Sequence, residues 1–151
     1  MKLGILSDTH GLLRPEVPAV LEGCDAIFHA GDIGGQDILD ALGELAPVHT
    51  VRGNNDWGSW GEKLPLRLEL ELEGKHICMA HMKRDLPADL SPFDLVITGH
   101  THKYRAERQG GLLLLNPGSC GPRRFGQPVT LALAEWTGEG FAARELTIPW
   151  D

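Results

Sequence analysis

The sequence of 151 residues predicts an α/β fold in which two β-sheets pack together and helices lie outside them. Three observations support this fold. Short apolar runs alternate with amphipathic segments at the start of the chain, a strictly alternating stretch begins at Leu66, and almost every apolar run ends in a polar loop. The length fits a single domain over residues 1–151, which is long enough to bury a sizeable core.

Three strands and two helices are expected in the first part of the chain. The strands are short apolar runs over residues 2–7, 26–30 and 48–51. The first helix is expected to have Pro15 in its first turn and to end at Gly23. The second covers residues 36–45, where apolar residues recur at helical spacing. Parallel strands that alternate with helices bind ligands at their carboxyl ends, so the polar residues there are candidates for a site.

A hairpin and further strands are expected in the second part of the chain. The leucines at 66, 68, 70 and 72 alternate with charged residues, which is typical of a strand with one buried face. Glu73-Gly74 then forms a tight turn into a partner strand over residues 75–80. The polar segment 83–92 is expected to hold a short helix or a loop. Later strands are expected over residues 94–98, 112–115, 129–134 and 141–148.

The composition is that of an ordinary globular protein, with 42% hydrophobic and 23% charged residues. A net charge of -7 argues against nucleic-acid binding and against binding to an anionic membrane. A small phosphorylated substrate remains compatible with this charge, because a bound metal reverses the local field. Asp8 interrupts the first apolar run before a signal peptide can form, and the three cysteines have no paired spacing. We therefore expect a cytoplasmic protein with reduced thiols.

Seven residues with oxygen or nitrogen donor atoms follow the predicted strands, namely Asp8, His10, Asp32, Asn54, His81, His100 and His102. On extended backbone, residues two positions apart point to the same face, so His100 and His102 are expected to converge. Asp8 and His10 have the same spacing. Taken singly, each of the seven has an ordinary explanation as a turn, cap or core residue. Taken together, they indicate a metal site, because several separate strands end in donors.

The donor types indicate which ions would bind. Carboxylate, imidazole and amide oxygen suit Mn²⁺, Fe²⁺, Zn²⁺, Ni²⁺ or Co²⁺, and the absence of thiolates argues against a structural zinc site. Seven donors exceed the needs of one four-coordinate ion. They suit two ions that share a bridging carboxylate and keep open positions for water.

The order of these motifs resembles that of the calcineurin-like metallophosphoesterases. The motifs are Asp8-x-His10, Gly31-Asp32-x-x-Gly35, Gly53-Asn54-Asn55-Asp56, His81 and Gly99-His100-x-His102. The chain length and the Asn116-Pro117-Gly118-Ser119 segment resemble the small prokaryotic phosphodiesterase branch of the family, of the YfcE and MJ0936 type. This resemblance implies a four-layer α/β/β/α sandwich of two mixed β-sheets flanked by helices.

The resemblance also implies a reaction and a distribution of ligands. Two divalent ions, with Mn²⁺ expected, would support phosphodiester hydrolysis through in-line attack of a metal-bridging hydroxide. Asp32 would bridge the two ions. The first ion would be bound by Asp8, His10 and His102, and the second by Asn54, His81 and His100. Related proteins form dimers or tetramers, so a homodimer or homotetramer is expected here.

One departure from the family pattern concerns Asn55, because many members have a histidine at this position. An amide can donate a hydrogen bond to a phosphoryl oxygen but cannot deliver a proton to a leaving group. We expect Asn54, Asn55 and His81 to take part in catalysis. Asn55, Arg123 and Arg124 are the expected substrate contacts, although the two arginines fit a solvated loop equally well. The role of the neighbouring Asp56 stays open.

Three side chains outside the ligand set have alternative interpretations. His29 lies inside an apolar run, where it would be a core residue or would support the ligands. Trp57 and Trp60 flank Gly58, and loop packing or a subunit contact explains them as well as a role as walls of a substrate cleft.

The alternative function is a non-catalytic protein-binding scaffold on the same fold, as in the retromer subunit that resembles this family. Such scaffolds have partly lost the ligand set, whereas all seven positions here hold competent donors, which favours an enzyme. The His-x-His pair alone is also compatible with an amidohydrolase-type deaminase. That fold needs an eight-stranded barrel of about 250 residues, so this chain is too short.

Overall fold

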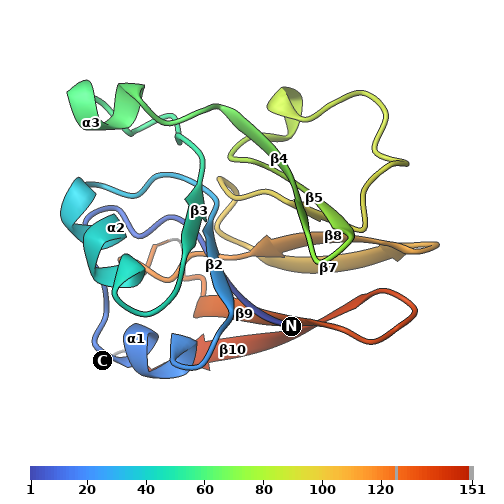
Figure 1. Ribbon diagram of the computed structural model, residues 1–151. Coiled ribbons are helices and arrows are strands. Elements are labelled where there is room, and N and C mark those ends of the chain that lie inside the picture. The colour runs from blue at the N-terminus through green and yellow to red at the C-terminus, as the bar shows by residue number, and fades with distance from the viewer. Residues whose placement is uncertain (125, 150–151) are drawn as a thin grey trace.

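The computed structural model describes residues 1–124 and 126–149, which form two five-stranded β-sheets packed face to face (Figure 1). The first sheet has the order β10 (Phe141–Ile148), β9 (Val129–Trp136), β1 (Lys2–Leu6), β2 (Ala26–His29) and β3 (Val48–Thr50). The second has the order β4 (Arg67–Leu72), β5 (Lys75–Ala80), β6 (Leu95–Ile97), β8 (Leu112–Pro117) and β7 (Tyr104–Gln109). This arrangement confirms the predicted α/β class with two packed sheets.

Both sheets are mixed, as expected. In the first sheet β1, β2 and β3 are parallel, and β9 runs antiparallel to β1. In the second, β5, β6 and β8 are parallel, and the edge strands β4 and β7 run antiparallel to their neighbours. Each sheet therefore has three parallel strands side by side, and the predicted donors follow the carboxyl ends of five of these six strands.

The main core lies between the sheets, where Ile5 and Phe28 of the first sheet meet Met79 and Ile97 of the second. The outer face of the first sheet is covered by α1 (Glu16–Leu21) and α2 (Gln36–Gly43) (Figure 1). The outer face of the second sheet is covered by the segment 83–94, whose regular structure is one 3₁₀ turn, η1 (Lys83–Asp85). The fourth layer is thus a loop with a short helical turn, one of the two forms expected for this polar segment.

Two elements were not predicted from the sequence. One is the edge strand β7, whose residues are mostly polar and exposed and show no apolar alternation. An edge strand needs a hydrogen-bonding partner on one side alone, so its side chains can remain wet, and charges there discourage pairing with other chains. The other is the four-residue helix α3 (Ser59–Glu62). Among the described residues, no helix has both the length and the apolar character needed to cross a membrane.

The predicted hairpin between β4 and β5 is present. Glu73 and Gly74 have φ angles of 49° and 80°, and a turn with two positive φ angles matches the right-handed twist of the strands on either side.

Candidate metal centre

The seven predicted ligands lie on five loops that follow β1, β2, β3, β5 and β6. Asp8, Asp32 and His81 are almost completely buried, with 0%, 2% and 2% of their surface exposed. Asn54 and His100 are exposed at the surface of the same region. Burying two carboxylates is costly unless cations or hydrogen-bond donors compensate them, so this cluster requires an explanation.

Asp8, His10 and His102 form the first group of potential ligands. Asp8 Oδ1 lies 3.6 Å from His10 Nε2 and 3.3 Å from His102 Nε2. Two ligands at about 2.1 Å from one ion are themselves separated by about 3 to 3.5 Å. The structure therefore brings together the three residues expected around the first ion, with ligand atoms within 4.8 Å of one another and both histidines within a few tenths of an ångström of the expected distance from Asp8.

The second group comprises Asp8, Asp32 and His81. Asp32 Oδ2 lies 3.4 Å from His81 Nε2 and 3.7 Å from His10 Nε2, so this carboxylate stands between the two groups as a bridging ligand would. The His100 ring packs edge-on against the His81 ring, with centroids 5.2 Å apart.

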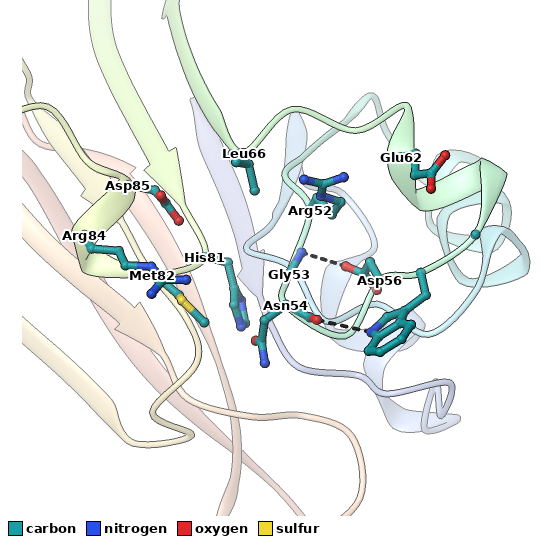
Figure 2. Close-up of a pocket in the computed structure, with 12 residues that line it drawn as sticks. Arg52, Gly53, Asn54, Asp56, Glu62, Leu66, His81, Met82, Arg84 and Asp85 are labelled. Atoms are coloured by element: carbon teal, nitrogen blue, oxygen red, sulfur yellow. Dashed lines mark hydrogen bonds between the residues drawn. The ribbon is translucent and has the colours of Figure 1, made fainter.

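Two features of the second group extend the sequence-based expectation. Asn54 and His81, which are expected to bind the same ion, lie next to each other on the wall of one cavity (Figure 2). Asp8 Oδ1 is 3.9 Å from His81 Nε2, so a second carboxylate approaches this group.

Three buried polar atoms of the cluster lack hydrogen bonds within the described part of the chain. They are Asp8 Oδ1, His10 Nε2 and His81 Nε2. Buried polar atoms in proteins are nearly always hydrogen-bonded, so three such atoms within one cluster are an exception that needs a reason. Divalent cations in the two groups would satisfy these atoms, with Asp8 and His10 in one group and Asp8 and His81 in the other, and their chemistry therefore fits the expected metal ions.

The protonation state of the carboxylates suits a cation as well. Burial alone would raise the pKa of Asp8, but contacts with His10 and His102 and the proximity of His81 outweigh it and hold that pKa well below its usual range. Burial also acts to raise the pKa of Asp32, but contacts with His81 and Asn55 outweigh it and lower that pKa. Both carboxylates are thus ionised at neutral pH.

The backbone at the ligands is strained. Six non-glycine residues of the described chain have positive φ angles, and five of them are predicted ligands: Asp8, His10, Asp32, His100 and His102. Such angles are uncommon outside glycine and cluster at functional sites. The expectation that His100 and His102 lie on extended backbone is therefore wrong. The strand β6 ends at Ile97, so both histidines lie beyond it. They belong to a tight loop with left-handed backbone, and this loop sets the orientation of the two rings.

The orientation of His81 is set by its second ring nitrogen. His81 Nδ1 lies 2.7 Å from the carbonyl oxygen of Ala30 and donates a hydrogen bond to it, which leaves the lone pair of Nε2 directed at the carboxylates. Ser7 fixes Asp8 in a similar way, because its hydroxyl donates to Asp8 Oδ2 over 2.6 Å.

Asp56, whose role the sequence left open, joins two of the ligand loops. Its carboxylate is 4% exposed and accepts hydrogen bonds from four backbone N–H groups. The donors are Asp32 at 2.9 Å, Ile33 at 2.8 Å, Gly34 at 3.2 Å and Gly53 at 2.8 Å. Asp56 therefore holds the loop that carries Asp32 against the loop that carries Asn54.

Asn55 contacts the central carboxylate. Its backbone N–H donates to Asp32 Oδ1 over 2.9 Å, and its side-chain Nδ2 donates to Asp32 Oδ2 over 3.0 Å. The amide expected to meet a phosphoryl oxygen is thus already engaged in orienting Asp32.

Asn116 is a positioning residue that sequence reasoning missed, although it belongs to the Asn116-Pro117-Gly118-Ser119 segment. Its Nδ2 donates to Gly99 O and to Thr101 Oγ1, both over 3.0 Å, and this fixes the loop that carries the two histidines. Ser119 Oγ donates to the carbonyl oxygen of Asp8 over 3.1 Å. The signal available in the sequence was the position of this segment at the end of a strand, where the other strand-end loops carry donors.

The two predicted arginines differ in their positions. Arg124 lines a cavity of about 340 Å³ together with His10, Asp32 and Asn55, where it can meet a phosphate. Arg123 is exposed, and its guanidinium donates to the carbonyl oxygen of Gly126 over 3.5 Å. It does not line this cavity.

His29 supports the ligand loops from behind. Its Nδ1 accepts the N–H of Gly31 at 3.1 Å, and its Nε2 lies 3.0 Å from Thr9 Oγ1. The Thr9 hydroxyl donates to the carbonyl oxygen of Ile33 over 2.7 Å, so its lone pair accepts the proton carried by His29 Nε2. His29 is completely buried, and burial lowers its pKa to about 4.

This network predicts a pH dependence of stability. Between pH 6.5, the ordinary pKa of histidine, and about pH 4, the unfolded state binds a proton at His29 that the folded state does not. The contribution of His29 to the free energy of unfolding of the metal-free protein is therefore fully present above pH 6.5. It is lost as the pH falls toward 4, and this loss amounts to about 3 kcal/mol. Urea unfolding in chelator across this range measures the slope.

The matched variant for this experiment is His29→Asn, which keeps an acceptor for the Gly31 N–H but does not titrate. The slope of stability against pH should be smaller in this variant by about one proton. Equal slopes in the two proteins would show that His29 does not cause the pH dependence.

Comparison with known proteins agrees with this geometry. Residues 1–139 match the model of the calcineurin-like phosphoesterase superfamily domain. A probable metallophosphoesterase of Methanothermobacter thermautotrophicus is 34% identical over 148 residues, covering 88% of this chain and 85% of that protein. Phosphodiesterase YfcE of Escherichia coli K12 is 30% identical over 165 residues, covering 89% of this chain and 88% of that protein.

Solved structures share the fold. An archaeal phosphodiesterase superposes with a TM-score of 0.82 at 24% identity, over 98% of this chain and all of the other. A single mutant of Vps29 from Entamoeba histolytica has a TM-score of 0.74 at 22% identity, over 99% of this chain and all of the other. At these identities the structures establish the fold alone. The family match over most of the chain and the order of its motifs show that the chain belongs to the calcineurin-like phosphoesterase superfamily.

Proposed function

We propose that this protein is a phosphodiesterase that uses two divalent ions, with Mn²⁺ the first choice, to hydrolyse small phosphoesters. The observation that carries the proposal is the convergence of three buried lone pairs, on Asp8, His10 and His81, that form no hydrogen bond within the described residues. Membership of the phosphoesterase family supports the reaction class. The name of the relative YfcE supports a diester substrate.

The ligand sets are part of this proposal. Asp8, His10 and His102 would hold the first ion, and Asn54, His81 and His100 the second, with Asp32 between them. When bound, the ions would supply Lewis acidity and an activated water that attacks phosphorus in line with the departing oxygen.

The protein's own groups position the reactants. Asn55 and Asp56 hold Asp32 in place from both sides of its loop. The Arg124 guanidinium faces the cavity beside His10, where it would bind a phosphoryl oxygen through charge-assisted hydrogen bonds. No proton donor is available at position 55, so the leaving oxygen would depart without help from that residue.

Location and assembly complete the proposal. The net charge of -7 favours a small phosphorylated substrate over nucleic acid or an anionic membrane. The three cysteines are free and buried, which suits the reducing cytoplasm. A homodimer or homotetramer, as the family resemblance implies, would be measured by size-exclusion chromatography with light scattering.

The function is tested by removing metal with a chelator and adding back Mn²⁺, Fe²⁺, Ni²⁺, Co²⁺ or Zn²⁺ in separate samples. Turnover of bis(p-nitrophenyl) phosphate should be lost in chelator and should return with at least one ion. If the protein binds two ions per chain but turns over no phosphoester with any of them, the non-catalytic scaffold becomes the better function.

The variant Asn55→His tests the consequence of the family departure. A histidine here could protonate the leaving oxygen, an effect typically worth about 10²- to 10⁴-fold for poorly departing alcohols. The gain should be largest for phenyl and alkyl esters and small for p-nitrophenyl esters, so the dependence of rate on leaving-group pKa should flatten. Asn55→Ala controls for the lost contact with Asp32. An unchanged leaving-group dependence in Asn55→His would contradict the role assigned to this position.

A further inference from the structure

The candidate metal centre borders two cavities. The smaller is the one that contains Arg124, and the larger, of about 440 Å³, is lined by His81 and Asn54 (Figure 2). Small-molecule sites typically have volumes of about 300 to 1,000 Å³. A phosphate held at the centre therefore has room for substituents on two sides, which a diester requires and a monoester does not.

Two arginines line the larger cavity. Arg52 lies two residues before Asn54, and Arg84 lies in η1, three residues after His81. Within residues 1–124 and 126–149, neither guanidinium forms a hydrogen bond or an ion pair, although both line this cavity (Figure 2). Each of these arginines thus lies within three residues of a proposed ligand in the chain. Unpaired guanidinium groups of this kind bind phosphate oxygens well.

An apolar wall completes the cavity. Trp57 is 75% exposed, yet its Nε1–H donates to the carbonyl oxygen of Asn54 over 3.2 Å, so the indole is held beside the ligand loop. Leu66, which is 47% exposed, and Met82 line the same cavity. An exposed indole with a fixed orientation offers a stacking surface for a planar ring.

Two acidic residues limit the charge that this cavity accepts. Glu62 and Asp85 also line it, on opposite sides of the view in Figure 2, and neither pairs with an arginine within the described chain. Their carboxylates would repel a polyanion such as a nucleic-acid strand. The charges of these two arginines and two carboxylates cancel, so the anionic group of a substrate arm would be bound by the unpaired guanidinium groups and not by an excess of positive charge in the lining.

We infer that the larger cavity binds one arm of the diester and that this arm carries an aromatic ring and a second phosphate, as in a nucleotide. Arg52 and Arg84 bind the second phosphate, and Trp57 stacks on the ring. The inference rests on the proposed phosphodiesterase function, because it takes the phosphorus under attack to lie beside Asp32 and His81.

The test compares two substrates that differ in the second phosphate alone. They are thymidine 5′-(p-nitrophenyl phosphate) and its 3′-phosphorylated derivative, which share one chromophoric leaving group. With the Mn²⁺-loaded protein, kcat/KM should be at least about tenfold higher for the 3′-phosphorylated substrate, because two charge-assisted contacts are added. Arg52→Gln and Arg84→Gln should each lower this ratio about threefold to tenfold.

The matched control is Arg144→Gln, which makes the same change in charge at an exposed position of β10 outside the cavity. The ratio should stay at its wild-type value in this variant. A wild-type ratio of one, with bis(p-nitrophenyl) phosphate still hydrolysed, would overturn the inference and leave the proposed function intact.

A binding experiment separates the two hypotheses further. Thymidine 3′,5′-bisphosphate should quench tryptophan fluorescence in the metal-free and the Mn²⁺-loaded protein, and Trp57→Leu should abolish most of the quenching. If no ester is hydrolysed, the proposed function fails. The inference is then judged on binding alone. It is contradicted if Arg52→Gln and Arg84→Gln both bind thymidine 3′,5′-bisphosphate with the dissociation constant of the wild-type protein.

Discussion

Replacing Asp32 by alanine is expected to lower the bound metal from two ions per chain to none and to reduce phosphodiesterase activity by at least about a thousandfold. The physical reason is the position of Asp32 Oδ2, which lies 3.4 Å from His81 Nε2 and 3.7 Å from His10 Nε2 and so serves both ligand groups. A thousandfold loss corresponds to about 4 kcal/mol of transition-state stabilisation. Elemental analysis of the purified protein measures the metal, and the steady-state rate measures the activity.

The control for this variant is Asp37→Ala. Asp37 is an exposed carboxylate in the first turn of α2, five residues along the chain, so its loss changes the net charge equally without touching the ligands. Two ions per chain and full activity are expected in this control. Retention of two ions by Asp32→Ala would refute the bridging assignment, even if activity were lost.

Replacing Asp56 by alanine is expected to give the largest loss of stability of any single polar change in the chain, about 4 kcal/mol. The variant leaves four backbone N–H groups without their acceptor in a buried position, and each unsatisfied donor costs about 1 to 3 kcal/mol before the loops relax. Urea unfolding of the metal-free protein measures the free energy, and Tm should fall by about 10 °C.

Asp94→Ala is the matched control, because the Asp94 carboxylate accepts one backbone N–H, that of His76, near the surface. Its loss should cost about 1 kcal/mol. The isosteric variant Asp56→Asn retains one oxygen acceptor and should fall between the two. Equal stability of the Asp56 and Asp94 variants would show that the four hydrogen bonds of Asp56 add nothing beyond one.

Asn55 and Asp56 together show how this centre differs from the pattern expected for the family. An acid beside a histidine would orient that histidine for proton transfer, whereas here the acid binds backbone N–H groups and Asn55 binds the central carboxylate. Both residues thus hold Asp32 in place. Under the proposed function, a centre of this kind would suit substrates whose leaving groups depart without protonation.

Most of the architecture was predictable because it depends on local patterns. Apolar runs and alternation indicated nine of the ten strands. A strand buried on both faces appears as a continuous apolar run, and a strand buried on one face appears as an alternation of apolar and polar residues. The strand β7 left no such trace, because both of its faces are largely wet. The donors were predictable for a related reason: the carboxyl ends of parallel strands in one sheet meet at one edge, so Asp8 and Asp32 had to lie close together, whereas packing of the second sheet brings His81 to them.

The sequence by itself determined the order of the elements, the donor set and the chemistry it suits, because each of these depends on residue type and local spacing. Only the tertiary structure decided which loops meet. It gave Asp56 four backbone donors from two loops, placed Asn116 behind the histidine loop and turned Arg52 and Arg84 toward one cavity. Those contacts join residues distant in the chain, and their geometry follows from sheet packing and left-handed loop backbone, which no local pattern encodes.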